Sequence, residues 1–205
     1  LANLLAIEGV TYAQFADAMQ YLLYPNGEYL VTPAALKIAK ALQDGISSAA
    51  AVARMANMDR AFAIAPTASC SYRSKDADGF TCAPEIAPPI AKTVDRDSGT
   101  FGVQTYEYGD VEIASDVGWE NYKRVADGIM RLYNRTGLLH GYWFNWWSDL
   151  TIMDESFIEE WLESPQTSLY YSLQVMGDVQ DKSDAYAALS ESDVDDYLAN
   201  LFGIF

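Results

Sequence analysis

The sequence predicts an α/β fold in which helices alternate with short parallel strands. Three observations lead to this prediction. The chain has 205 residues, half of them hydrophobic, which is enough for one sizeable domain with a real core. Segments with helical spacing of apolar residues alternate with short apolar segments. The short segments read as strands that are buried on both faces, as strands of a parallel sheet are.

Three helices are expected in the first third of the chain. Apolar residues at helical spacing predict the first over residues 11–23. Thr32 is a good N-cap and a proline follows it at the first helical position, which predicts a helix over residues 33–43. Gly45 is expected to end this helix. A third, short helix is expected over residues 47–56, capped by a serine at its start.

The rest of the chain continues the alternation. A polar loop is expected over residues 73–84. An extended but irregular segment is expected over residues 85–109. Strands are expected over residues 60–67, 138–149 and 167–175, and helices over residues 115–137 and 151–164.

Composition and charge narrow the classes of function. The formal net charge is −16, from 29 acidic and 13 basic residues, and such a surface repels nucleic acid and anionic lipid. No apolar run approaches the ~20 residues that span a bilayer, and no secretory signal is visible at the start. We therefore expect a cytoplasmic protein that binds neither nucleic acid nor membranes.

Small and hydroxyl residues follow the strand expected over residues 60–67. Small side chains let backbone N–H groups approach an anion, hydroxyls add donors, and a helix beginning here would direct its positive end at a phosphate. The alternative is an ordinary strand end capped by Ser and Thr. The stretch lacks the lysine of a P-loop. The candidate phosphate-binding residues are Pro66, Thr67, Ala68, Ser69, Cys70 and Ser71.

Cysteine and histidine are scarce. Cys70, Cys82 and His140 are the only residues of these two types. They are too few for a zinc framework, so no metal site is predicted. We expect both cysteines to be reduced thiols, and the single histidine argues against a histidine-dependent catalytic triad.

Three segments, in this order, resemble the catalytic (large, or alpha) subunit of ribonucleotide reductase, and compact viral-type reductases in particular. "AIAPTASCS" at 63–71 resembles the P-T-A-S-type loop of that family, and "GFTCAPEIAPP" at 79–89 is similar to the segment that follows it. "SLYYSLQ" at 168–174 resembles the L-Y-Y strand near the end of the family's barrel. The resemblance covers about residues 3–180.

The resemblance implies a fold and a division of the chain. Residues 1–176 would be the C-terminal half of the family's ten-stranded α/β barrel domain. The chain begins in apolar sequence at Leu1 and lacks the radical-bearing cysteine and its Asn and Glu companions. We interpret it as a fragment or split product, inactive until the N-terminal half of the catalytic subunit is supplied. Residues 177–205 are expected to be an acidic tail with a docking helix over about residues 190–202.

The resemblance also implies a radical chemistry, the reduction of ribonucleoside di- or triphosphates to deoxyribonucleotides. Residues 66–71 would surround the substrate phosphates, and Tyr170 and Tyr171 would relay a radical toward the barrel centre. Considered without the resemblance, the two tyrosines read as core residues with satisfied hydroxyls. This chain would bind no cofactor itself, and thioredoxin or glutaredoxin would be the reductant.

Two alternatives stay open for the source of the radical and for the class of function. The radical would come from a metal-containing small subunit, which the paired tyrosines favour. Alternatively, the chain would be a fragment of an adenosylcobalamin-dependent ribonucleoside-triphosphate reductase. Outside the family, it would be a non-catalytic phosphate-binding α/β module. A viral origin would place the protein in the host cytoplasm.

Overall fold

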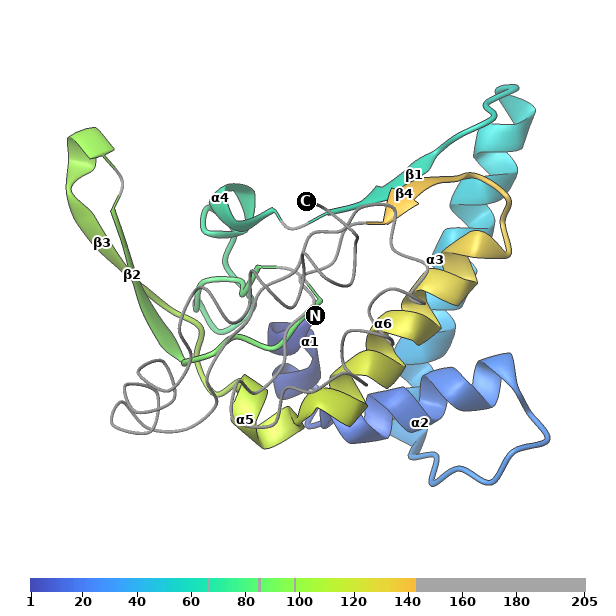
Figure 1. Ribbon diagram of the computed structural model, residues 1–205, viewed down its shortest axis with the longest axis horizontal. Coiled ribbons are helices and arrows are strands. Elements are labelled where there is room, and N and C mark those ends of the chain that lie inside the picture. The colour runs from blue at the N-terminus through green and yellow to red at the C-terminus, as the bar shows by residue number, and fades with distance from the viewer. Residues whose placement is uncertain (66, 85, 98, 143–205) are drawn as a thin grey trace, which may run out of the picture. The chain divides into compact units, whose positions relative to one another are not determined.

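The computed structural model describes residues 1–65, 67–84, 86–97 and 99–142, all of which belong to one compact unit (Figure 1). Helices and two small sheets make this unit a mixed α/β structure, and its described strands close no barrel. The elements in chain order are α1 (Ala2–Ile7), α2 (Tyr12–Leu23), α3 (Pro33–Met55), β1 (Phe62–Ile64), α4 (Ala68–Ser71), β2 (Thr93–Asp97), the 3₁₀ helix η1 (Gly99–Phe101), β3 (Val103–Glu107), α5 (Ala114–Val117), α6 (Trp119–Asn134) and β4 (Leu139–Tyr142).

Helix α2 confirms the first predicted helix and begins with a reciprocal cap. The Thr11 hydroxyl accepts a hydrogen bond from the Gln14 N–H at 3.1 Å, and the Gln14 side chain accepts one from the Thr11 N–H at 3.0 Å. Helices α2 and α6 lie side by side (Figure 1). A Cβ atom at Gly128 of α6 would lie 3.2 Å from the Met19 Cβ, so a glycine permits this close approach.

Helix α3 begins as predicted but does not end at Gly45. The Thr32 hydroxyl caps it by accepting a hydrogen bond from the Ala35 N–H at 3.3 Å. The predicted break at Gly45 is wrong, because one 23-residue helix replaces the two helices expected there. A glycine inside a helix costs about 1 kcal/mol relative to alanine. Continued burial of Ile46, Ala50 and other apolar side chains beyond the glycine outweighs that cost.

Strands β1 and β4 form a parallel pair, which confirms the prediction of parallel strands. Phe62 pairs with Leu139, and Ile64 pairs with Tyr142. Helix α6 lies between the two strands in the sequence, so they are joined through a helix as parallel strands require. The expected burial of both faces is wrong for β1, because Ala63 is exposed while the neighbouring Phe62 packs against the helices.

One aromatic side chain anchors β1 to the helical layer. Phe62 packs against a buried cluster of Ala50, Ala53 and Leu138, and its ring meets the Tyr133 ring edge-on at 5.1 Å between centroids. These contacts join the end of α3, the end of α6 and the start of β4. They hold the amino end of β1 against the helices.

The segment over residues 85–109, expected to be irregular, contains an antiparallel hairpin of β2 and β3. The pairing runs from Thr93 opposite Glu107 to Asp97 opposite Val103. Most hairpin residues are exposed, so no apolar alternation revealed the strands in the sequence. At the turn, Gly99 has a φ of 62°, a left-handed conformation that favours glycine.

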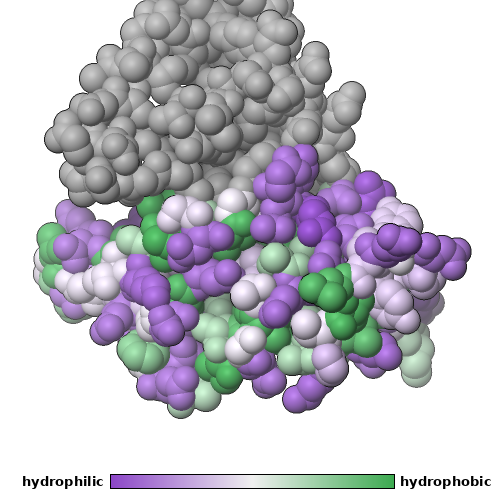
Figure 2. All heavy atoms as spheres, turned by 90° about the horizontal axis from the view of Figure 1, so that it is seen from below, coloured by the Kyte–Doolittle hydropathy of each residue, from purple (hydrophilic) through white to green (hydrophobic). Residues whose placement is uncertain are grey.

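The face seen in Figure 2 carries small groups of hydrophobic residues interspersed with hydrophilic ones. Single exposed apolar side chains of this kind are normal on protein surfaces. Within the described residues, no helix is both long and apolar enough to cross a membrane. The helix predicted over residues 151–164, the strand predicted over 167–175 and the tail at 177–205 lie outside the described residues.

Candidate functional site

The predicted phosphate-binding residues follow the carboxyl end of β1. Thr67 precedes α4, and the single turn of α4 contains the next four candidate residues, while Pro66 lies outside the described residues. The N–H groups of Cys70 and Ser71 donate to the Thr67 carbonyl at 3.0 and 2.9 Å. These two N–H groups therefore close the turn.

The start of the turn leaves two backbone donors available. No oxygen of the described residues accepts a hydrogen bond from the N–H of Ala68 or Ser69. Such unpaired donors are inherent to the first turn of a helix and are satisfied by side chains, water or ligands. The Ser69 side chain is exposed, so a ligand can reach this end of the turn.

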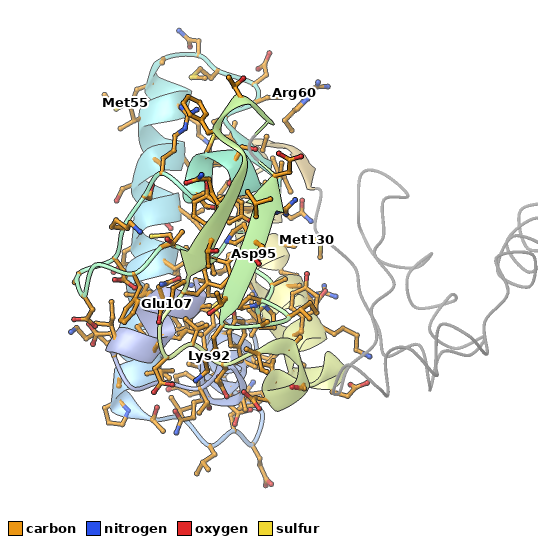
Figure 3. All side chains as sticks on the ribbon, turned by 90° about the vertical axis from the view of Figure 1, so that its left-hand side faces the viewer. Met55, Arg60, Lys92, Asp95, Glu107 and Met130 are labelled. Atoms are coloured by element: carbon orange, nitrogen blue, oxygen red, sulfur yellow. The ribbon has the colours of Figure 1, made fainter. Side chains whose placement is uncertain are left out.

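A hollow of about 690 Å³, which we call the clasp pocket, separates α4 from the β2–β3 hairpin. Figure 3 shows the hairpin nearest the viewer, with Lys92 toward its base and Asp95 along β2. Tertiary structure brings together two segments that are more than twenty positions apart in the sequence. The residues that line the clasp pocket are Ser69, Tyr72, Arg73, Arg96, Asp97, Phe101, Gln104 and Tyr106.

Three tyrosines join the two walls of the clasp pocket. The rings of Tyr72 and Tyr106 stack at 4.4 Å between centroids with an interplanar angle of 11°. The Tyr108 hydroxyl lies 3.3 Å from the Tyr72 hydroxyl, within hydrogen-bonding distance. Arg96 adds a cation–π contact, with its guanidinium carbon 5.6 Å from the Tyr72 ring centroid, and its Nε donates to the Tyr72 hydroxyl at 3.1 Å. The hairpin is thereby fixed against the segment that follows α4.

The charges that line the clasp pocket are opposite in sign to the chain as a whole. Among the described residues that line it, Arg73 and Arg96 are cationic and Asp97 is the one carboxylate, whereas the whole chain carries a formal net charge of −16. The Asp97 carboxylate accepts a hydrogen bond from the Gly99 N–H at 2.8 Å. A local excess of arginine in an acidic protein favours an anionic ligand at this place.

Sequence reasoning missed Asn3, a buried residue that binds the loop after α4 and the end of the hairpin. The Asn3 amide nitrogen lies 2.7 Å from a carboxylate oxygen of Asp76 and 3.1 Å from the carbonyl oxygens of Thr81 and Tyr108, and its two hydrogens are shared among these three acceptors. The Asn3 side-chain oxygen accepts from the Ala83 N–H at 2.8 Å. One side chain thus ties α1 to the loop over residues 76–83 and to the end of the hairpin. Its only signal in the sequence is one amide among apolar residues.

Asp76 acquires a shifted pKa through this network. Partial desolvation raises the pKa of the Asp76 carboxyl, but a hydrogen bond from Asn3 and backbone hydrogen bonds from Phe80, Asp78 and Gly79 together lower it below its ordinary value. A carboxyl with a lowered folded-state pKa stabilises the fold fully above its unfolded-state pKa, and this stabilisation is lost as pH falls through the folded-state value.

We expect Asp76→Asn to reduce the acid sensitivity of the fold. The difference in free energy of unfolding between wild type and variant should be greatest near neutral pH. It should shrink as the pH falls below about 4, where the wild-type carboxylate becomes protonated. Urea denaturation between pH 7 and acid measures both values, with Asp78→Asn as the control on the same loop. A difference that stays constant with pH would contradict this account.

The remaining residues considered in the sequence are the two cysteines and the histidine. Cys70 is exposed and Cys82 half-buried, and both are free thiols. The His140 Nδ1 lies 3.1 Å from an Arg60 nitrogen on the exposed side of β4. Among the described residues, no three His, Cys, Asp or Glu side chains gather closely enough to hold a metal ion.

A second, smaller hollow of about 190 Å³ lies between α3 and α6 and also contains two arginines. Arg54 donates to the Thr136 carbonyl, and Arg135 donates to the Leu23 carbonyl at 3.1 Å. Because both guanidinium groups already bind backbone carbonyls, this hollow reads as a structural contact between helices.

Comparison with known proteins adds no assignment. No protein-family model matches the chain, and no curated protein matches it significantly. The predicted radical-relay residues, Tyr170 and Tyr171, lie outside the described residues.

Proposed function

We propose that this chain is the C-terminal part of a ribonucleotide reductase catalytic subunit, an oxidoreductase that reduces ribonucleoside di- or triphosphates. The observation that carries the proposal is the position of the hydroxyl-rich turn. Strand β1 leads from its carboxyl end into α4, and Ser69 of α4 borders a pocket that contains two arginines. In α/β folds, substrates bind at the carboxyl ends of the parallel strands.

The parallel pair of β1 and β4 supports the proposed ten-stranded barrel. Parallel sheets are normally covered on both faces and contain more than two strands. Among the described residues, β1 and β4 pair only with each other. In the proposed barrel, the remaining strands come from the rest of this chain and from the N-terminal half of the catalytic subunit.

The candidate residues take two roles in this proposal. Thr67, Ala68 and Ser69, with the two residues that follow them and Pro66 before them, surround the substrate phosphates through hydroxyl and N–H donors. Tyr170 and Tyr171 relay a radical, since a phenol can lose a proton and an electron together when a hydrogen-bonded partner takes the proton. The small subunit supplies the radical, and thioredoxin or glutaredoxin supplies the reducing equivalents.

Reconstitution tests the proposal directly. We expect no reduction of ribonucleotides by the 205-residue chain alone. Deoxyribonucleotide should form when the N-terminal half of a compact reductase and a radical source are added. Parallel reactions with a metal-containing small subunit and with adenosylcobalamin identify the radical source. Turnover by the isolated chain, or no turnover in either reconstituted reaction, would contradict the proposal.

A non-catalytic phosphate-binding module is the second candidate function. The specific observation that favours it is that Ser69, Arg73 and Arg96 line one hollow within the described part of the chain. This candidate requires no missing half. It therefore expects phosphate compounds to bind to the isolated chain, and no reconstitution to produce turnover.

A further inference from the structure

Two tyrosine rings from the two walls of the clasp pocket lie face to face. Tyr72 follows α4, and Tyr106 lies on β3, more than thirty positions later in the sequence. Their ring centroids are 4.4 Å apart and their planes are 11° from parallel, so the facing ring carbons lie near van der Waals contact. Within the described part of the chain no other two phenol rings stack this closely, since Tyr72 and Tyr108 stack at 6.4 Å.

The neighbours of Tyr72 fix its ring in this position. The Arg96 Nε donates to the Tyr72 hydroxyl at 3.1 Å, and the Tyr108 hydroxyl lies 3.3 Å from the same oxygen. Tyr108 is buried, whereas Tyr72 and Tyr106 are half-buried and line the hollow. The stacked pair is therefore held in one geometry and is still open to molecules in solvent.

Stacked phenols are chemically suited to join. A one-electron oxidant converts a phenol into a phenoxyl radical by removing one electron and one proton. Part of the unpaired spin then lies on the ring carbons next to the C–O bond. A bond between two such carbons begins to form across the gap between parallel rings. A stack at van der Waals distance therefore holds the reacting carbons close together before oxidation.

We propose that Tyr72 and Tyr106 form a dityrosine cross-link when a peroxidase and hydrogen peroxide oxidise the protein. Each phenol gives up one electron and one proton, and one carbon–carbon bond forms between the rings. The hydrogen on each joined carbon then leaves as a proton, and a proton returns to each phenolic oxygen. Hydrogen peroxide accepts the two electrons and two protons and becomes two molecules of water. The inference goes beyond the proposed function and does not depend on it, because the oxidant comes from outside the chain.

The cross-link fastens the β2–β3 hairpin to the segment that follows α4. Before oxidation, Tyr72 contacts the hairpin through ring stacking and hydrogen bonds. The new bond closes a loop of more than thirty residues and so restricts the unfolded chain, as a disulfide does. The cross-linked protein should therefore unfold at a temperature about 5 °C higher than the same protein before oxidation.

Peroxidase treatment of the 205-residue chain at low protein concentration tests the proposal. The intact mass should fall by two hydrogen atoms while the chain remains a monomer, and dityrosine fluorescence should appear. Digestion with trypsin should then release residues 61–73 joined to residues 97–123. Fragmentation of this linked pair should assign the bond to Tyr72 and Tyr106.

Phenylalanine variants separate the stacked pair from the other tyrosines. Tyr72→Phe and Tyr106→Phe each keep the ring but remove the phenol, and each should slow formation of the intramolecular link at least about tenfold. Tyr106→Phe should also unfold at an unchanged temperature after the same treatment. Tyr24→Phe, which alters an exposed tyrosine at the end of α2, is the matched control and should keep the wild-type rate.

Circular dichroism of each variant separates loss of the link from loss of the fold. Tyr72→Phe also removes the hydrogen bond from Arg96. The Tyr106 hydroxyl makes no hydrogen bond with a described residue, so Tyr106→Phe decides the question even if Tyr72→Phe does not fold. The absence of an intramolecular link in wild type would overturn the proposal. A link that maps mainly to other tyrosines, or an unchanged rate in Tyr106→Phe, would overturn it as well.

Discussion

Replacing Asn3 by alanine is expected to lower the free energy of unfolding by about 3 kcal/mol, because several buried partners lose their hydrogen bonds at once. The side chain is 6% exposed and bonds to Asp76, Thr81, Tyr108 and Ala83. After the substitution, two backbone carbonyls and one backbone N–H remain in a site with little access to water. An unsatisfied buried polar group costs about 1–3 kcal/mol, and partial entry of water reduces the sum.

Chemical denaturation of Asn3→Ala and wild type measures this difference. Asn134→Ala is the matched control, since Asn134 ends α6 on the surface, and it should change the free energy of unfolding by less than about 0.5 kcal/mol. A variant as stable as wild type would show that the four hydrogen bonds contribute little.

Replacing Tyr170 or Tyr171 by phenylalanine is expected to abolish turnover of the reconstituted reductase. Each substitution removes one phenolic oxygen, so the proton and electron can no longer leave the ring together. Most of the ring packing is preserved, and the free energy of unfolding should therefore change by only about 1 kcal/mol. Loss of turnover without loss of stability is what distinguishes a relay from a pair of core tyrosines.

Rates of deoxyribonucleotide formation and denaturation curves of the same preparations test this prediction. Tyr21→Phe on the surface of α2 is the control and should keep full turnover. Near-normal turnover in both Tyr170→Phe and Tyr171→Phe would make packing the better account of the pair. It would also favour adenosylcobalamin as the source of the radical.

Local signals in the sequence were sufficient for α2 and for the start of α3. The apolar spacing of residues 11–23 predicted α2, and the cap at Thr32 predicted the start of α3, because capping and amphipathic burial act over a few neighbouring residues. The single helix predicted over residues 115–137 is wrong in its start, because Gly118 separates α5 from α6. The end of α3 could not be predicted in this way. A glycine only weakens a helix, and packing of the residues after Gly45 decides that α3 continues.

The β2–β3 hairpin could not be predicted from the sequence, for a different physical reason. Exposed strands carry no apolar alternation, and the pairing of Thr93 with Glu107 depends on contacts across the turn rather than along the chain. Because the hairpin was not predicted, Arg96 and Phe101 were not assigned to any site. The sequence therefore indicated the hydroxyl-rich turn but not the second wall of the pocket beside it.

By itself, the sequence determined the mixed α/β class, the parallel pairing of strands joined through a helix, and the candidate turn at residues 66–71. These features depend on short-range patterns that one stretch of chain carries alone. Only the tertiary structure decided that Arg73 and Arg96 line one hollow, and that Asn3 binds the end of the hairpin. Contacts between residues tens of positions apart depend on how the elements pack, which no local pattern of side chains encodes.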